Sequence, residues 1–196
     1  ASGFSLGGAL RTSLFWLVFA AYTLVTTAGL MWFAHFKVFG LSQGMSAAQA
    51  AFLASLTALG GALGRLLMGY ASDHIGRFPS LIGACVLEVG LFLGFGIGVP
   101  HAAIFAFAVL SGFAFGTWLA LYGPTSTDLF GMRSAGSVYG ALYLSYGIGG
   151  LAGPMLGGLL ADLSGSYALA FFVMAGVCAA GGALFLLAML RRPPLF

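Results

Sequence analysis

The chain has 196 residues, of which 61% are hydrophobic and only 6% are charged, and its mean hydropathy is +1.07. Soluble domains are about 25% charged, so this composition excludes a water-soluble globular protein and indicates a chain whose solvent is a lipid bilayer. The net charge of +3 comes from seven Lys and Arg residues spread along the whole chain, which argues against a nucleic-acid partner. Two cysteines without a CxxC or Cys/His cluster exclude a zinc site or a disulfide framework.

The chain opens with ASGFSLGGALRTS, which lacks the charged start and the cleavage site of a signal peptide. This segment is typical of a polar linker that leads into a membrane helix. Because the chain also does not begin with Met, we expect it to be a fragment of a longer protein.

Six apolar runs follow, each long enough to cross a membrane, which takes about 20 residues. In chain order they are 12–36, 48–71, 79–99, 102–123, 136–161 and 166–190. The segments between them are short and leave no room for a soluble domain. We therefore expect one all-α integral membrane domain, 1–196, with six transmembrane helices.

Basic residues fall mainly on one side of this predicted topology. With an even number of spans, both ends share a side, and Lys37 is the basic residue of the opposite side. By the positive-inside rule, both termini are cytoplasmic, and we expect a bacterial inner (plasma) membrane. The basic residues assigned to the cytoplasmic side, with Arg65 near it, are Arg11, Arg77, Arg133, Arg191 and Arg192.

Glycines recur four residues apart within four of the predicted helices. Such spacing places them on one helix face and permits close backbone contact, so we expect a compact bundle. Pro154, inside the run 136–161, predicts a kink; a moving helix and plain packing both remain open. The glycine series are Gly60 and Gly64; Gly90, Gly94 and Gly98; Gly112 and Gly116; and Gly149, Gly153 and Gly157.

The stretch GRLLMGYASDHIGR, 64–77, gathers much of the scarce charge. Gly69, Asp73, Gly76 and Arg77 form the pattern G-x-x-x-D-x-x-G-R at the cytoplasmic end of the second predicted helix. Asp73 can accept hydrogen bonds from a neighbouring helix N-terminus, and Arg77 can bridge to a carboxylate. The pattern predicts a conformational latch; a loop that only sets the topology is the alternative.

This pattern resembles the loop motif of the major facilitator superfamily, G-x-L-(A/S)-D-R-x-G-R, with Ala71 at the Leu position and His74 in place of Arg. The segments 118–131 and 139–167 are similar to the tenth and eleventh helices of the oxalate/formate antiporter family and its monocarboxylate-porter relatives. The resemblance implies helices seven to twelve of a twelve-helix fold. The partner is then an N-terminal six-helix half of the same protein.

Arg65 is the main candidate for substrate binding. A buried Arg costs roughly 2.5–3.5 kcal/mol on insertion, so it needs a partner, water or a substrate, and its fork matches a carboxylate. The resemblance implies the same role, because antiporters of this family place a carboxylate-binding arginine in this helix. The alternatives are that Arg65 reaches the interface or pairs with Asp73 or Asp128.

Aromatic residues are the next candidates. The resemblance implies that Trp118 and Tyr122, four residues apart, help to enclose the carboxylate, although packing is an equal alternative. Tyr143 and Tyr146 follow in the fifth predicted helix. Oxalate antiporters carry a lysine close to position 146, and this helix has no Lys, which favours a monocarboxylate such as lactate, pyruvate or formate over oxalate.

Further candidates lie in other helices. In the first, Tyr22 and Thr26 share one face and are candidate cavity contacts. Glu88 and His35 are candidates for proton coupling; a protonated Glu88 bonded to a neighbour and an interfacial His35 are the alternatives we favour. The acidic residue that monocarboxylate porters often carry one turn before the arginine is Gly61 here.

Together these features predict a secondary active transporter of small organic anions that works by alternating access. Its partners would be the anion, a co-transported proton and the lipid bilayer, with no cofactor, no metal and no nucleic acid. The alternatives are a major facilitator carrier of a different substrate, or a non-transporting membrane assembly or signalling subunit. Paired aspartates, a Ser/His dyad and HExxH are absent from the predicted helices, so we do not expect an enzyme.

Overall fold

The computed structural model describes residues 3–191, which form seven helices. Helices α2 to α7 are long and apolar enough to cross a membrane, whereas α1 has five residues. These six spanning helices confirm the predicted fold class. The helices are α1 (Leu6–Leu10), α2 (Ser13–Ser42), α3 (Ala47–Ile75), α4 (Arg77–Ile97), α5 (His101–Phe130), α6 (Ala135–Ser164) and α7 (Ala168–Arg191).

Several helices extend beyond the apolar runs that predicted them. Helix α5 continues through Pro124 and ends at Phe130, rather than at 123. The Thr127 hydroxyl donates to the carbonyl oxygens of Gly123 and Pro124, at 3.3 and 3.0 Å, and Gly131, with φ +77°, ends the helix. Hydropathy marks the hydrocarbon layer, but a helix can continue into the polar interface.

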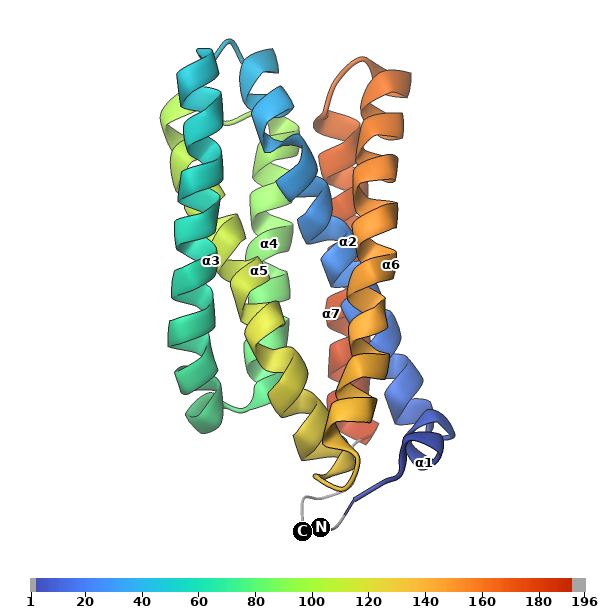
Figure 1. Cartoon of the computed structure of the whole chain (residues 1–196). Helices are drawn as coiled ribbons and strands as arrows, with labels where there is room; N and C mark the ends of the chain where they lie inside the picture. The colour runs from blue at the N-terminus through green and yellow to red at the C-terminus, as the bar shows by residue number, and fades with distance from the viewer. Residues whose placement is uncertain (1–2, 192–196) are drawn as a thin grey trace.

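The helices form a bundle with two layers (Figure 1). Helices α3, α5 and α6 lie toward the viewer and α4 and α7 lie behind them, while α2 crosses the bundle obliquely and passes behind α6. The main pairings are α3 with α5, α2 with α6 and α4 with α7. We call the side toward the viewer the front face, the end that carries α1 the α1 end, and the opposite end the distal end. Arg192, assigned above to the cytoplasmic side, lies outside the described residues.

Glycines hold two of these pairings together at backbone distance. A methyl group at Gly60 would overlap the carbonyl oxygen of Val109, and one at Gly116 would overlap that of Gly61, so α3 and α5 touch through their backbones. Gly149 and Gly153 meet residues Thr26 and Thr27 of α2 in the same way. The predicted packing role is therefore confirmed for α3, α5 and α6. In α4 it holds only for Gly94, which faces Phe107; a methyl at Gly90 meets no atom of residues 3–191 within 4 Å, and Gly98 caps the helix.

At the α1 end, the segment before α2 is tied to the loop between α5 and α6. Gly3 and Gly131 form an isolated antiparallel bridge, and the Phe4 amide donates to the Phe130 carbonyl at 2.8 Å. The rings of Phe4 and Phe130 also pack edge to face, with centroids 6.1 Å apart. A side chain at Gly3 would overlap the Phe130–Gly131 backbone. The sequence did not predict this contact, because it depends on backbone geometry at two loop glycines.

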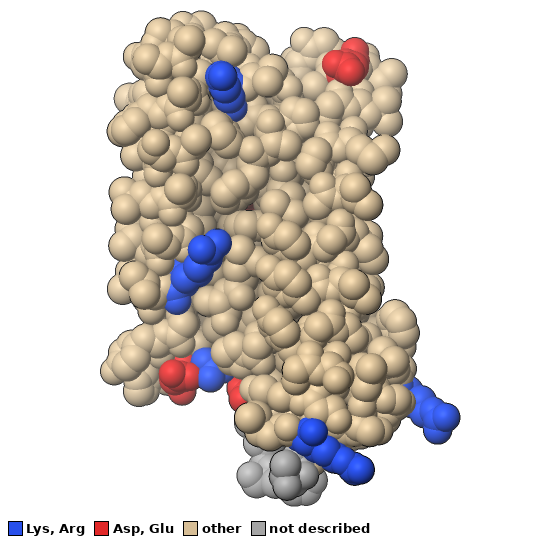
Figure 2. Space-filling model, viewed as in Figure 1, with Lys and Arg blue, Asp and Glu red and all other residues tan. Residues whose placement is uncertain are grey.

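Charged side chains gather at the two ends of the bundle (Figure 2). One basic side chain stands apart from the rest, at mid-height on the front face. The remaining surface in this view is almost free of charge, as expected for helices at the depth of the hydrocarbon core. The basic side chain within the span is therefore the starting point for locating a functional site.

Candidate functional site

Arg65 lies deep within a spanning helix. It is ten residues from the end of α3 at Ile75, which corresponds to about 15 Å of helix, deeper than the six residues to the predicted end at 71. The preceding residue, Gly64, packs on the Phe113 carbonyl of α5, so Arg65 turns away from that contact and its side chain is exposed. No carboxylate or hydrogen-bond acceptor within residues 3–191 pairs with it. The two carboxylates proposed as its alternatives, Asp73 and Asp128, both pair with Arg77 instead.

Three tyrosines of α6 form a row that reaches toward Arg65. The rings of Tyr143 and Tyr146 are nearly parallel, with centroids 5.2 Å apart, and Tyr139 lies 5.4 Å from Tyr143. The Arg65 guanidinium is close enough to Tyr146 to act on it electrostatically. Since α5 lies between α3 and α6 (Figure 1), this interaction crosses α5. None of the three hydroxyls has a hydrogen-bond partner in the described part of the chain, so each is free to donate, and Tyr146 is the one that interacts with Arg65.

A second group of polar aromatics lies beneath this row. Tyr22 of α2 stacks on Tyr122 of α5 with centroids 3.7 Å apart, and both are completely buried. Their hydroxyls are paired, that of Tyr22 with Thr125 at 3.4 Å and that of Tyr122 with Ser145 at 2.9 Å. This layer connects α2, α5 and α6 behind the tyrosine row.

Two further predicted contact residues belong to the same buried layer. The Thr26 hydroxyl donates to the Tyr22 carbonyl at 2.7 Å, and the Trp118 indole N–H donates to the Leu81 carbonyl at 3.4 Å. Both side chains are 0% exposed. Among the residues predicted to bind substrate, the structure therefore brings Arg65, Tyr143 and Tyr146 to one side and places the others behind them.

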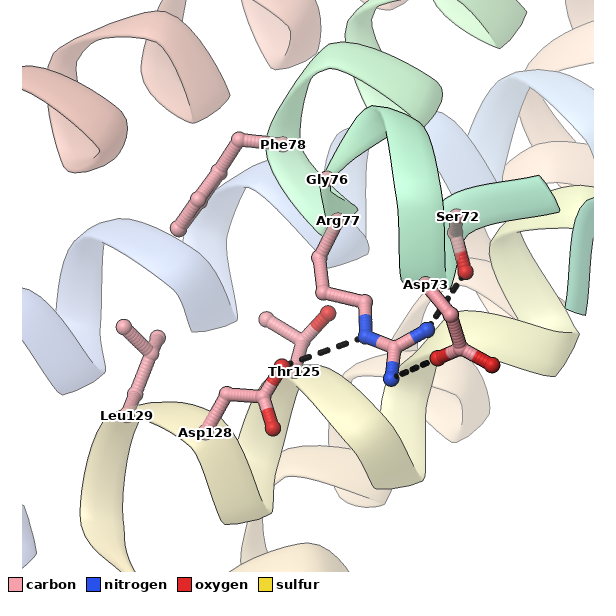
Figure 3. A pocket seen from close by; sticks show the side chains of 8 residues that line it. All are labelled: Ser72, Asp73, Gly76, Arg77, Phe78, Thr125, Asp128 and Leu129. Carbon is pink, nitrogen blue, oxygen red and sulfur yellow. Dashed lines mark hydrogen bonds and ion pairs between the residues drawn. The ribbon is translucent and has the colours of Figure 1, made fainter. Parts of the chain in front are cut away.

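Three of the four predicted latch residues, Asp73, Gly76 and Arg77, meet at the α1 end, where they line a cavity of about 200 Å³ (Figure 3). The Arg77 guanidinium contacts Asp73 at 2.5 Å, Asp128 of α5 at 3.1 Å and the Ser72 hydroxyl at 2.6 Å. Gly76, with φ +100°, makes the turn from α3 to α4. Asp73 thus pairs with Arg77 and not with a helix N-terminus.

Gly69, the first residue of the pattern, makes no close helix contact in the described chain. A methyl group there would meet nothing within 4 Å. The arrangement links three helices through one guanidinium, which is what a latch requires, while the sequence pattern itself contains only one of its two carboxylates.

The two titratable candidates for proton coupling lie apart from Arg65. Glu88 of α4 is 0% exposed; it accepts a hydrogen bond from Ser111 of α5 at 2.5 Å, and its Oε2 atom has no partner within residues 3–191. His35 of α2 is half-buried at the distal end and contacts Tyr167, in the loop before α7, and Pro154 of α6. Burial and the nearby Asp162 carboxylate raise the pKa of the Tyr167 hydroxyl, so this hydroxyl keeps its proton.

No group of three or more His, Cys, Asp or Glu side chains in the described range is placed to hold a metal ion. Cys85 and Cys178 are both buried and form no disulfide; the Cys178 thiol donates to the Cys85 carbonyl oxygen at 3.8 Å. The chemistry of this face therefore comes from one guanidinium and from phenol hydroxyls, which bind anions and hydrogen-bond acceptors.

These features define a polytopic α-helical membrane protein with a deep basic residue, Arg65, that has no partner in the described part of the chain. A family model for the Major Facilitator Superfamily matches residues 4–195. The chain therefore belongs to this superfamily, which confirms the resemblance of its loop motif.

The curated relatives include transporters with and without a named substrate. The MFS transporter asaE of Aspergillus flavus is 28% identical over 95% of this chain and 42% of that protein. The oxalate:formate antiporter of Oxalobacter formigenes is 28% identical over 81% of this chain and 38% of that protein. Monocarboxylate transporter 7 of Homo sapiens is 33% identical over 74% of this chain and 28% of that protein.

Among solved structures, the E. coli fucose:proton symporter FucP has the same fold, with a TM-score of 0.74 at 18% identity over 94% of this chain and 46% of that one. The chain thus spans less than half the length of each of these proteins.

Proposed function

We propose that this chain is the C-terminal six-helix half of a secondary active transporter that moves small monocarboxylates by alternating access. The observation that carries the proposal is Arg65, a guanidinium about 15 Å into the span without a partner in the described chain. An unpaired charge at that depth is costly, and an anionic substrate would supply the missing partner. The relatives named as oxalate:formate and monocarboxylate transporters support an anion of this class.

The chemistry of the site favours one carboxylate per substrate. The guanidinium of Arg65 can bind a carboxylate through two parallel hydrogen bonds, and the free hydroxyls of Tyr143 and Tyr146 can donate to further oxygens. Oxalate would place a second negative charge in the site, and α6 carries no lysine to meet it. Lactate, pyruvate and formate are therefore the substrates we propose, ahead of oxalate.

The remaining predicted residues take supporting roles in this proposal. Tyr22, Thr26 and Tyr122 hold α2, α5 and α6 together behind the site, and Trp118 ties α5 to α4. Ser72, Asp73, Arg77 and Asp128 form a latch that closes in one conformation and opens in another.

A second six-helix half would cover the front face. Basic residues at the α1 end support a cytoplasmic location for that end, and we propose a bacterial inner membrane. If a proton is co-transported, Glu88 and His35 are its candidate carriers.

The test is the uptake of labelled lactate, pyruvate, formate and oxalate by the intact protein in proteoliposomes, compared with Arg65→Gln. Losing one partner of a desolvated charge pair costs about 2 kcal/mol or more, so uptake at low substrate concentration should fall roughly 30-fold or more. Arg133→Gln, at the α1 end of the bundle, is the matched control and should transport normally.

Uptake that is unchanged in Arg65→Gln would contradict the assignment of this residue. If a correctly folded wild-type protein takes up none of the four anions, the superfamily membership stands and the carboxylate proposal fails. That outcome would favour a carrier of another substrate, which is compatible with a relative such as asaE whose description names none, or a non-transporting subunit.

A further inference from the structure

His35 makes two hydrogen bonds that connect three elements at the distal end. Its Nε2 atom lies 3.0 Å from the carbonyl oxygen of Pro154 in α6. Its Nδ1 atom lies 3.0 Å from the hydroxyl of Tyr167, in the loop before α7. Both ring nitrogens of this half-buried side chain are therefore engaged, by elements that lie more than a hundred residues away in the chain.

The protonation pattern of the neutral ring follows from these partners. A carbonyl oxygen can only accept a hydrogen bond, so Nε2 carries the hydrogen and donates it to Pro154. Nδ1 is then the acceptor, and the Tyr167 hydroxyl, which keeps its proton, donates to it. One neutral tautomer therefore satisfies both ring nitrogens, the Pro154 carbonyl and the Tyr167 hydroxyl. The charged groups near this end are Asp162 of α6 and Lys37 of α2.

The surface of α6 is shaped to receive the imidazole. A methyl group at Gly157 would come within 3.0 to 3.1 Å of the His35 ring and would overlap Met31. Gly158 faces the same ring at an ordinary contact distance of 3.6 Å. The two glycines therefore form a socket one turn beyond Pro154, and this contact explains Gly157, which sequence analysis assigned only to packing.

The point of attachment on α6 is also its weakest point. Proline has no N–H, so the Gly150 carbonyl loses its usual helical partner, and a helix is easiest to bend at such a position. The part of α6 before Pro154 carries the tyrosine row and is held to α2 by the Gly149 and Gly153 contacts. The part after Pro154 is held to α2 through His35 and its glycine socket.

We propose that His35 is a positioning residue that fixes the distal part of α6 against α2 by its hydrogen bond to the Pro154 carbonyl. The bond to Tyr167 orients the imidazole and selects the tautomer that donates to Pro154. Without the donor at Nε2, the distal part of α6 would bend independently of the part that carries the tyrosines. This role does not depend on which substrate is carried.

The experiment measures distances between spin labels on the intact protein in lipid. One label replaces Val38 of α2 and the other Leu159 of α6; both side chains are about half exposed, at 51% and 54%. The native Cys85 and Cys178 are buried, which keeps background labelling low. A second label pair, at Leu66 and Leu144, reports on the part of α6 before Pro154.

Four variants separate the two hydrogen bonds. His35→Ala removes both, His35→Asn keeps a polar group near the Nδ1 position, His35→Gln restores a donor near the Nε2 position, and Tyr167→Phe removes only the tyrosine bond. We expect a shifted and broader 38–159 distance distribution in His35→Ala and His35→Asn. We expect a distribution close to that of the wild type in His35→Gln and only slight broadening in Tyr167→Phe.

Three results would overturn the proposal: an unchanged 38–159 distribution in His35→Ala, no recovery in a folded His35→Gln, or equal broadening of the 66–144 pair, which would indicate general loosening. His101→Ala, an exposed histidine at the start of α5, is the matched control and should leave both pairs unchanged. If His35→Ala does not fold, the comparison of His35→Gln with His35→Asn decides the question. None of these measurements requires transport, so a failure of the carboxylate proposal would not be mistaken for a failure of this one.

Discussion

Two arginines at opposite ends of one sequence stretch lie in opposite surroundings. Arg77, at the α1 end, contacts two carboxylates and a hydroxyl within 3.1 Å. Arg65, twelve residues earlier, contacts none in the described chain although it lies deeper in the span. Arg77 lies nearer the end of the bundle, where an unpaired charge costs less, yet it is the arginine that the chain supplies with partners. The difference indicates that Arg77 stabilises the bundle, and it supports the proposal that Arg65 binds a group from outside the described chain.

The largest effect on stability is expected at the paired arginine. Arg77→Gln leaves Asp73 and Asp128 facing each other without a cation. Both carboxylates are about half exposed, at 54% and 45%, so solvent screening limits the loss to about 1–2 kcal/mol. Thermal unfolding in detergent should show a midpoint lower by several degrees, whereas Arg65→Gln should leave it unchanged. Equal shifts in both variants would remove the contrast between the two arginines.

A smaller effect is expected from the tyrosine nearest to Arg65. Tyr146→Phe removes one hydroxyl donor and keeps the ring that stacks on Tyr143. A single hydrogen bond contributes about 0.5–1.5 kcal/mol, so the apparent KM for a monocarboxylate should rise about 2- to 10-fold. Tyr122→Phe, whose hydroxyl is already bonded to Ser145, is the control. A larger rise in KM in the control than in Tyr146→Phe would indicate that the substrate contacts the buried Tyr122 rather than Tyr146.

The smallest effect comes from giving Arg65 a partner like that of Arg77. Ala62 is exposed and lies three residues before Arg65, on a neighbouring part of the helix surface. Ala62→Glu should pair with the guanidinium and compete with the substrate; while the site is open to water, such an i,i+3 pair contributes only about 0.5 kcal/mol. Uptake at pH 7 should fall about twofold relative to Ala62→Gln.

The pH dependence of uptake by Ala62→Glu tests whether the added side chain inhibits through its charge. A glutamate loses its charge as the pH falls toward about 4.3, which would release Arg65. Inhibition should therefore fade with acidification, and inhibition that is independent of pH would show that the added side chain acts by its size.

Much of the architecture could be predicted from the sequence because it depends on local patterns. The six spans follow from apolar runs, and close helix packing follows from glycines four residues apart, such as Gly60 and Gly64, although the choice of α5 as the partner of α3 does not. The pairing of Asp73 with Arg77 could also be predicted, because the two residues are only four apart in the sequence. In each case the information is held by residues that are close in the chain.

The parts that sequence analysis missed depend on how distant helices face each other. For Trp118 and Tyr122, spacing alone could not choose between a cavity wall and packing, which were equal alternatives; the structure buries both, with α2 and α4 against that face of α5. The second carboxylate of the latch, Asp128, and the His35–Tyr167 contact join residues far apart in the sequence. The one local signal for the His35 contact was the pair of adjacent glycines, Gly157 and Gly158, beyond a proline.

The bridge between Gly3 and Gly131 also determines how force passes through the molecule. A pull on the chain before α1 would reach the Phe130–Gly131 backbone before it reached α2, because the Phe4 amide is bonded there. Asp128 stands only a few residues from that point, with its carboxylate on Arg77. The N-terminal segment is thus linked through the end of α5 to the guanidinium cluster, so tension on it would load helix α5 together with the Asp128–Arg77 ion pair.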